Sequence, residues 1–419
     1  MVKRIFLHLL FLFLLTGSLW SQDTISLPDC YKAMEAVHPF GLEPEVYNQV
    51  LQLNQRIDNT NYLPKLTLNA KATYQSDVVK LDINIPSIDI PSPSKDQYGA
   101  SVDVNQVIYD GGTTKALKEL HQAEYNTNLQ KVSVELYQVK KQINQLYFSV
   151  LILEKNKASI GVSIDNLNER IKIVNEQVDN GVLLNTNLLV LQSQKIKLEQ
   201  NIDELSAMLK SAKEALGILI GRSSESILLT EPVATDGENS IRPELQLFQV
   251  QKEQLNKAGK LTATERMPKL AGFGQFGYGK PGLNMLNDKF DTYYIVGAKL
   301  TWNIWDWNQV KYKRQSFNVQ HDLIDISEKA FLQGQQTELT KVSNTILQLE
   351  TAVEKDDQLV TIQKKILENY AAQVENGVIT TTEYVNQLNE VLLAEIKLNT
   401  HKIKLIQAKT DENTIQGKI

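Results

Sequence analysis

The side chains that could perform catalysis or hold a metal ion are few, and they lie far apart in the sequence. Four of the five histidines follow the N-terminal apolar run, are separated by dozens of positions and have no metal-binding spacing: His38, His121, His321 and His401. The acidic pairs Asp356-Asp357 and Asp411-Glu412 are interpreted as solvated helix faces. Neither a phosphate-binding glycine loop nor a nucleophile elbow is present. The sequence therefore predicts a protein that is not an enzyme, with no cofactor and no metal site.

Cys30 is the only cysteine, which excludes a disulfide framework and a cysteine-based zinc site. We expect a buried thiol there, because Cys30 lies too far behind the apolar N-terminal run to be a lipoprotein attachment site. Residues 1–21 are typical of a secretory signal peptide, with Lys3 and Arg4 before an apolar run too short to span a bilayer. Without these two cations the net charge falls from −5 to −7, which argues against a nucleic-acid partner.

The sequence contains the same unit twice. Gln-Val-Asp-Asn-Gly-Val at 177–182 returns as Gln-Val-Glu-Asn-Gly-Val at 373–378, and Val-Ile-Tyr-Asp at 107–110 returns as Asn-Ile-Trp-Asp at 303–306. The two landmarks are 71 positions apart in both copies (181 − 110 and 377 − 306). A constant length indicates packed helices, because loops vary in length. Upstream, the first copy carries eight extra residues in 82–94, which predicts a loop there.

Heptad spacing of apolar residues predicts two long helical hairpins. A first seam includes Leu136, Ile143, Leu167 and Val174, and a second begins after Gly181. The run 113–178 contains no proline and would extend roughly 99 Å as a helix. Gly181 and Gly377 are expected at the tip turns. A coiled-coil spacer would show the same periodicity.

Strand pairs with one apolar and one polar face precede each long helix. We expect the polar side chains to line the bore of a membrane barrel and the others to face lipid or form an aromatic girdle. The predicted polar positions are Ser101, Asp103, Asn105, Thr301 and Asn303. The predicted lipid-facing or girdle positions are Tyr98, Val102, Tyr294, Val296, Leu300 and Trp302, and Tyr293 is a further girdle candidate.

A soluble half-buried sheet would alternate in the same way, so a periplasmic coiled-coil scaffold or adaptor that spans no membrane remains the alternative. The aromatic residues in both strand pairs favour the barrel. Four strands cannot close a barrel, and an open edge is not tolerated in lipid, so several copies of the chain must share one. At each strand-to-helix junction we expect Asp110 and Asp306 to bond the first free amides of the following helix.

The chain resembles the TolC-type outer-membrane efflux proteins over nearly all of its exported length. The resemblance rests on the segment Gln106 to Gly112, which includes Asp110, Gly111 and Gly112, and on the corresponding segment Leu300 to Trp307 of the second copy. The tip motifs at Gly181 and Gly377 and the two Pro-Lys-Leu motifs support it. In the second copy, Trp307-Asn308 replaces the usual Gly-Gly after the aspartate.

The resemblance implies a homotrimer with a 12-stranded outer-membrane β-barrel, continued by an α-helical tunnel through the periplasm. It also implies a periplasmic adaptor and an inner-membrane pump as partners, with passive conduction in efflux or type I secretion. The acidic gate positions of the family match Glu383 and the neutral Asn187 and Asn386, so the gate would rest on one carboxylate per chain.

The predicted organisation is two structural repeats, 22–230 and 231–419. In the first, an N-terminal helix precedes strands at about 66–79 and 96–109, a long helix 113–178 and a return helix 183–220. In the second, a helix 242–264 precedes strands at about 270–279 and 292–305, a long helix 309–374 and a return helix 380–412.

Overall fold

The computed structural model describes residues 24–79, 92–232 and 241–418. The signal segment 1–21 and most of the loop expected at 82–94 lie outside the described residues. The chain forms two compact units, and each unit draws on both sequence repeats. One unit comprises residues 43–131 and 244–330, and the other comprises the remaining segments. The repeats are therefore intertwined and do not form separate domains.

The first unit contains a four-stranded antiparallel sheet in the order β1-β2-β3-β4. The strands are β1 (Lys65–Tyr74), β2 (Asp96–Tyr109), β3 (Lys269–Lys280) and β4 (Asp291–Thr301). β4 ends at Thr301 and not near 305, which corrects the prediction that Trp302 and Asn303 belong to the strand. The ladder stops because the partner of Thr301 is Lys269, and the residue before it, Pro268, has no N–H to donate.

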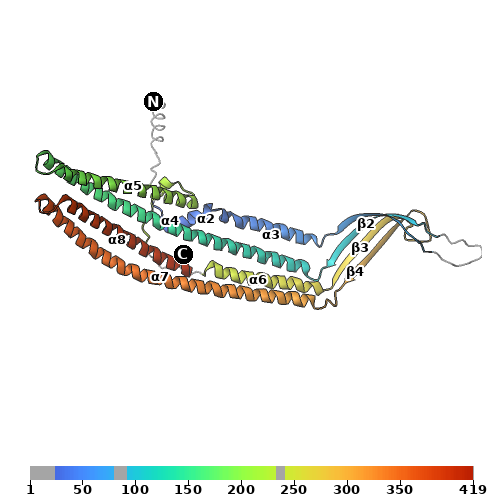
Figure 1. The fold of residues 1–419 in the computed structure, drawn as a ribbon. Helices are drawn as coiled ribbons and strands as arrows, with labels where there is room; N and C mark the ends of the chain where they lie inside the picture. Colours follow the sequence, from blue (N-terminus) through green and yellow to red (C-terminus); the bar gives the residue numbers. More distant parts are fainter. Residues whose placement is uncertain (1–23, 80–91, 233–240, 419) are drawn as a thin grey trace, which may run out of the picture. The chain divides into compact units, whose positions relative to one another are not determined.

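Four helical segments of the same unit continue the four strands (Figure 1). α3 (Glu43–Thr60) leads into β1, and β2 leads into α4 (Thr113–Asp179). α6 (Pro243–Ala263) leads into β3, and β4 leads into α7 (Gln309–Glu375). Each strand is therefore joined directly to one of the four helices.

Contacts between side chains give the order of these four helices in one layer. Lys118 of α4 donates to Asn59 of α3 at 2.5 Å. Lys257 of α6 donates to Glu119 of α4 at 3.2 Å. Lys252 of α6 forms ion pairs with Asp325 and Glu328 of α7 at 2.5 and 2.7 Å. The order is therefore α3-α4-α6-α7, with α3 and α7 at the two edges.

The second unit contains the two hairpins, in which α4 turns into α5 (Asn185–Ile220) and α7 turns into α8 (Thr381–Gln416). The predicted seam is the core here, because Leu167, Val174 and Leu191 are all buried. They pack with Leu388 and Leu392 of α8 in one cluster. The apolar heptads thus determine which helix faces meet.

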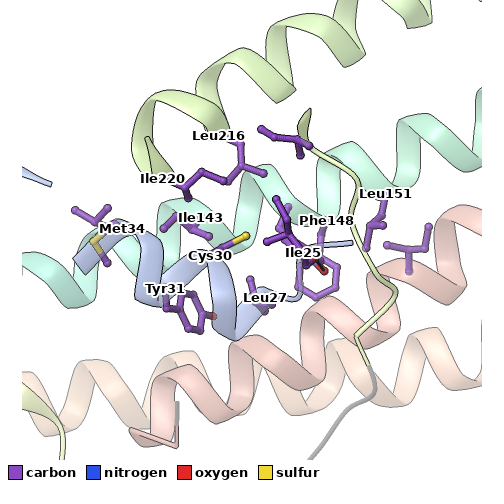
Figure 2. Close-up of a cluster of buried hydrophobic side chains, with 14 residues drawn as sticks. Ile25, Leu27, Cys30, Tyr31, Met34, Ile143, Phe148, Leu151, Leu216 and Ile220 are labelled. Atoms are coloured by element: carbon purple, nitrogen blue, oxygen red, sulfur yellow. Dashed lines mark hydrogen bonds between the residues drawn. The ribbon is translucent and has the colours of Figure 1, made fainter. Parts of the chain in front are cut away.

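A short helix α2 (Leu27–Val37) completes the core of the second unit (Figure 2). Cys30 and Met34 of α2 are fully buried beside Ile143 of α4 and Leu216 of α5. Burial raises the pKa of the Cys30 thiol to about 12. The thiol is therefore a protonated core group, as the sequence predicted.

No helix within residues 24–79, 92–232 and 241–418 is long and apolar enough to cross a membrane.

Candidate functional site

One face of the sheet is apolar across all four strands. Leu68 pairs with Val102, Val102 with Phe276 and Phe276 with Tyr294, so a single row crosses the sheet. In the isolated chain Leu68 is 75% exposed, Phe276 60% and Tyr294 75%. The predicted lipid-facing residues of β2 and β4 share this face by the register: Tyr98, Val102, Tyr294, Val296 and Leu300. Such a large contiguous apolar surface indicates contact with lipid or with another protein.

Aromatic side chains flank this apolar face at both ends of the strands. At the end with the β3–β4 connection, Phe290 stacks on Tyr98 and Tyr278, with ring centroids 6.4 and 5.3 Å apart. At the end with the helices, Trp302 and Trp305 are exposed, and the Trp302 ring N–H donates to the Arg266 carbonyl at 3.1 Å. Two aromatic rings with a polar tip at each end of an apolar band are typical of membrane barrels.

The opposite face carries most of the polar side chains. Asn69 donates to Asp103 across β1 and β2, and Gln275 donates to Ser101 at 3.2 Å across β2 and β3. By register Asn105 and Thr301 lie on the same face, whereas Asn303 follows the end of β4. The face contains one buried oxygen without a hydrogen-bond partner among the described residues, Oδ1 of Asp103.

Tyr293 also lies on the polar face, so its prediction as a girdle residue was wrong. It pairs with Gly277, and a Cβ on Gly277 would lie 2.3 Å from the Tyr293 ring. Phe273 covers Gly297 in the same way, at 2.7 Å from its missing Cβ. The glycines of β3 and β4 therefore provide room for two aromatic rings on the polar side.

The strand-to-helix junctions are built alike in the two repeats. Asp110 accepts hydrogen bonds from the backbone N–H groups of Gly112 at 2.9 Å and Thr114 at 2.6 Å. Asp306 accepts from Asn308 and Val310, both at 3.1 Å. Burial alone would raise the pKa of Asp110, but the hydrogen bonds from Thr114, Tyr62 and Gly112 outweigh burial and lower it.

The junction of the second repeat keeps this turn without glycine. Gly111 and Gly112 have φ of +71° and +83°, and their counterparts Trp307 and Asn308 have φ of +52° and +63°. A left-handed conformation costs a residue with a side chain about 1–2 kcal/mol. The two repeats therefore have the same turn shape, and in the second repeat this shape strains the backbone at Trp307 and Asn308. The hydrogen bonds to Asp306 offset part of that strain.

The tip turns contain Gly181 and Gly377, with φ of +71° and +72°. α8 begins with a capping box in which the Thr380 N–H and hydroxyl donate to Oε2 of Glu383 at 2.7 and 2.9 Å. These bonds lower the pKa of the exposed Glu383 carboxyl, which therefore carries its charge over a wide pH range. α5 begins at the equivalent place without a side-chain cap, and Asn187 donates only to the Leu184 carbonyl at 3.3 Å. Asn386 is exposed one turn beyond Glu383.

Sequence reasoning missed Arg170, a buried cation next to the tip. Its Nη1 donates to Glu375 of α7 at 2.8 Å, and its guanidinium lies 5.4 Å from the centre of the Tyr384 ring of α8. Its Nη2 is buried without a hydrogen-bond partner in the described part of the chain. Arg170 therefore ties the first hairpin to the second. A charged residue beside a heptad position was the only signal in the sequence.

The candidate catalytic side chains do not come together. His401 lies 2.6 Å from the buried Asp356, His121 lies 3.1 Å from Glu124, and His321 lies 3.7 Å from Asp325. Each of these three histidines therefore lies beside a carboxylate, and the burial of Asp356 corrects the expectation that the Asp356-Asp357 pair is solvated. No group of histidine, cysteine and carboxylate residues that could hold a metal ion is found in the segments that the structure describes.

The fold is that of outer-membrane channel proteins. The outer-membrane protein VceC of Vibrio cholerae superposes with a TM-score of 0.66 at 14% identity, over 94% of this chain and 96% of that one. The CmeC channel of Campylobacter jejuni gives 0.67 at 15%, over 94% of this chain and 85% of that one. The open-state MtrE channel of Neisseria gonorrhoeae gives 0.64 at 13%, over 93% and 88%.

The single-chain fold expected from the TolC-type resemblance, long helical hairpins joined to strand pairs, is therefore confirmed. At these identities the likeness is one of fold. No family model matches the sequence, and neither does any curated protein.

Proposed function

We propose that three copies of this chain form a channel in the cell outer membrane that extends into the periplasm. The observation that carries the proposal is the apolar face that continues over all four strands and is exposed in the single chain. Water would oppose this exposure at about 25 cal/mol per Å² of apolar surface, whereas lipid removes the cost.

The edges of the sheet require further copies. β1 and β4 each pair with one strand only, so both present a row of unpaired backbone groups. Four strands per chain and the TolC-type resemblance together favour a 12-stranded barrel made by three copies. The polar face would then line a water-filled bore. The similarity of the fold to the CmeC and MtrE channels supports the same assignment.

The chain would act as a passive conduit. Cargo would enter at the periplasmic tip from an adaptor protein and an inner-membrane pump, which would supply the energy, and would leave through the barrel. Glu383 is the residue proposed to act at the tip gate, since threefold symmetry would place three exposed carboxylates around one axis. Asn187 and Asn386 would contribute neutral polar groups.

Fractionation of cells together with sizing of the detergent-solubilised protein tests the proposal. We expect the protein in the outer membrane, as a trimer, and ion conductance after its reconstitution into planar bilayers. A monomer in the soluble periplasmic fraction would favour the scaffold or adaptor alternative, and a trimer without conductance would refute the conduit.

A further inference from the structure

The two edges of the helical layer carry exposed apolar stripes. On α3 the stripe consists of Val46, Val50, Leu53 and Ile57, which are 48% to 62% exposed. On α7 it consists of Tyr312, Val319, Leu323 and Ile326, which are 59% to 62% exposed. Steps of three, four and seven residues place each set on one narrow strip of its helix.

Both stripes face away from the layer to which their helices belong. α3 uses its opposite side toward α4, where Asp58 is buried 3.7 Å from His121 and Leu51 is also buried. α7 uses other positions toward α6, where Asp325 and Glu328 pair with Lys252 at 2.5 and 2.7 Å. The stripes therefore have no partner within the described part of this chain, and they are a heptad seam without its second helix.

The spacing of one stripe fits the other in the antiparallel direction. Along α3 the steps from Val46 to Val50 to Ile57 are four and seven residues. Along α7, in the reverse direction, the steps from Leu323 to Val319 to Tyr312 are also four and seven residues. Leu53 then falls opposite Ser316, a small residue that leaves room for it.

The strands would bring these two helices together. α3 leads directly into edge strand β1 and α7 follows edge strand β4, both at the same end of the sheet. Successive strands are antiparallel, so β4 of one copy can continue the sheet only by pairing antiparallel with β1 of the next copy. That pairing places α7 of the first copy beside α3 of the second, running in opposite directions.

We propose that α3 of one copy packs on α7 of the next copy, with Val46 opposite Leu323, Val50 opposite Val319 and Ile57 opposite Tyr312. This inference rests on the proposed trimeric channel and deepens it by assigning the contact between copies and its register. The contact is heterologous, and it repeats around the ring until the last copy meets the first.

Paired cysteines test the register in full-length protein in membranes. Val50→Cys with Val319→Cys is the matched pair, and Val46→Cys with Tyr312→Cys is the mismatched control. In the proposed register Tyr312 lies 11 residues from the partner of Val46, roughly 16 Å along the helix. A disulfide requires Cβ atoms about 4 Å apart, so mild oxidation should give roughly tenfold more covalent trimer with the matched pair. Cys30 can stay, because it is buried.

A charge pair gives an independent measurement. Val50→Glu alone should lower the trimer yield roughly tenfold, because it places an acid in the apolar seam. Adding Val319→Lys should restore the yield, whereas adding Leu323→Lys should restore less. Val50 is exposed in the single chain, so the change leaves the fold of the monomer intact.

The outcomes separate the two proposals. A normal trimer in which the matched pair does not cross-link more than the mismatched pair would overturn the assigned seam and leave the channel intact. A wild-type protein that stays monomeric would overturn both. Preferential cross-linking of the matched pair, with rescue by the charge pair, would support both.

Discussion

An arginine on the apolar face of β1 should be far more damaging than one at the adjacent position. Leu68 and Thr67 are neighbours on the same edge strand, and both are exposed in the single chain. Leu68 belongs to the apolar row with Val102, and Thr67 pairs with Asp103 on the polar face. Folding of an isolated soluble chain therefore predicts the same tolerance for Leu68→Arg and Thr67→Arg.

A barrel in lipid predicts a large difference. The ten residues of β1, tilted by about 40°, span about 26 Å, close to the height of the apolar band of a membrane barrel. Leu68 is the fourth of these residues and so lies near the middle of the band. An arginine on the lipid face there costs about 2–4 kcal/mol, or roughly 6–12 kcal/mol for the three copies of a trimer. At Thr67 the side chain would enter the water-filled bore.

The assay is the yield of trimer in the outer membrane and its resistance to denaturant after extraction. We expect Leu68→Arg to abolish or strongly reduce the trimer and Thr67→Arg to give yields close to wild type. Ser101 is a poorer control than Thr67, because it is only 9% exposed and accepts a hydrogen bond from Gln275. Equal yields for the two variants would show that the apolar face does not contact lipid.

Three further predictions concern single carboxylates. Glu383→Gln should reduce cation selectivity and cation block in planar-bilayer recordings. The trimer yield should stay unchanged, because glutamine can still accept the hydrogen bond from the Thr380 N–H. Recordings identical to those of the wild type would show that Glu383 is not part of the gate. Asp110→Ala should lower the free energy of unfolding by about 1–2 kcal/mol in denaturant titrations, because two helix amides lose their acceptor. This cost should shrink as the pH falls through the lowered pKa of Asp110 in the folded protein, and a pH-independent cost would count against the cap. Burial raises the pKa of Asp411 to about 6, above its unfolded value of about 3.8, although the nearby Lys141 opposes the shift, so stability should rise as the pH falls through 6. Asp411→Asn should remove this dependence and add about 3 kcal/mol at pH 7, and an unchanged pH profile would refute the assignment.

The helices could be predicted closely because two independent signals coincide in them. The heptad steps and the lack of proline indicate a helix starting near Thr113, and the structure begins α4 at that residue. Buried seam residues such as Leu167 and Leu191 follow from the same periodicity. The apolar residues recur every three or four positions, so one polar residue in the second seam, Lys195, does not interrupt the pattern.

The faces of the sheet could be predicted only where the side chains themselves alternate. In β1 every second residue is apolar, so the register adds nothing to the assignment. In β3 four glycines carry no side chain, and the sequence therefore does not show which face Phe273 or its neighbours occupy. The pairing with β4 decides, and it places Phe273 and Tyr293 on the polar side.

At the end of β4 the sequence pattern predicts more strand than the structure contains. Trp302 and Ile304 continue the apolar alternation past Thr301, so the pattern predicts strand where the ladder has already stopped. Alternation reports side-chain faces, whereas a ladder needs a partner with a free N–H, and Pro268 provides none. At the tip, heptad reasoning treats polar residues as solvent-facing, and for that reason it missed the buried Arg170.

The lengths of the elements indicate which parts of the two repeats must match. α4 and α7 have 67 residues each, and α5 and α8 have 36 each, whereas the strands vary from 10 to 14 residues. One heptad more in either hairpin would move its tip turn by about 10 Å relative to the other. Equal lengths therefore place two tip turns at the same level in every copy, as a shared constriction requires. The chemistry at that level is unequal, since only α8 begins with a capping box and a carboxylate. A gate built from this chain would consequently take its shape from both hairpins and its charge from the second hairpin alone.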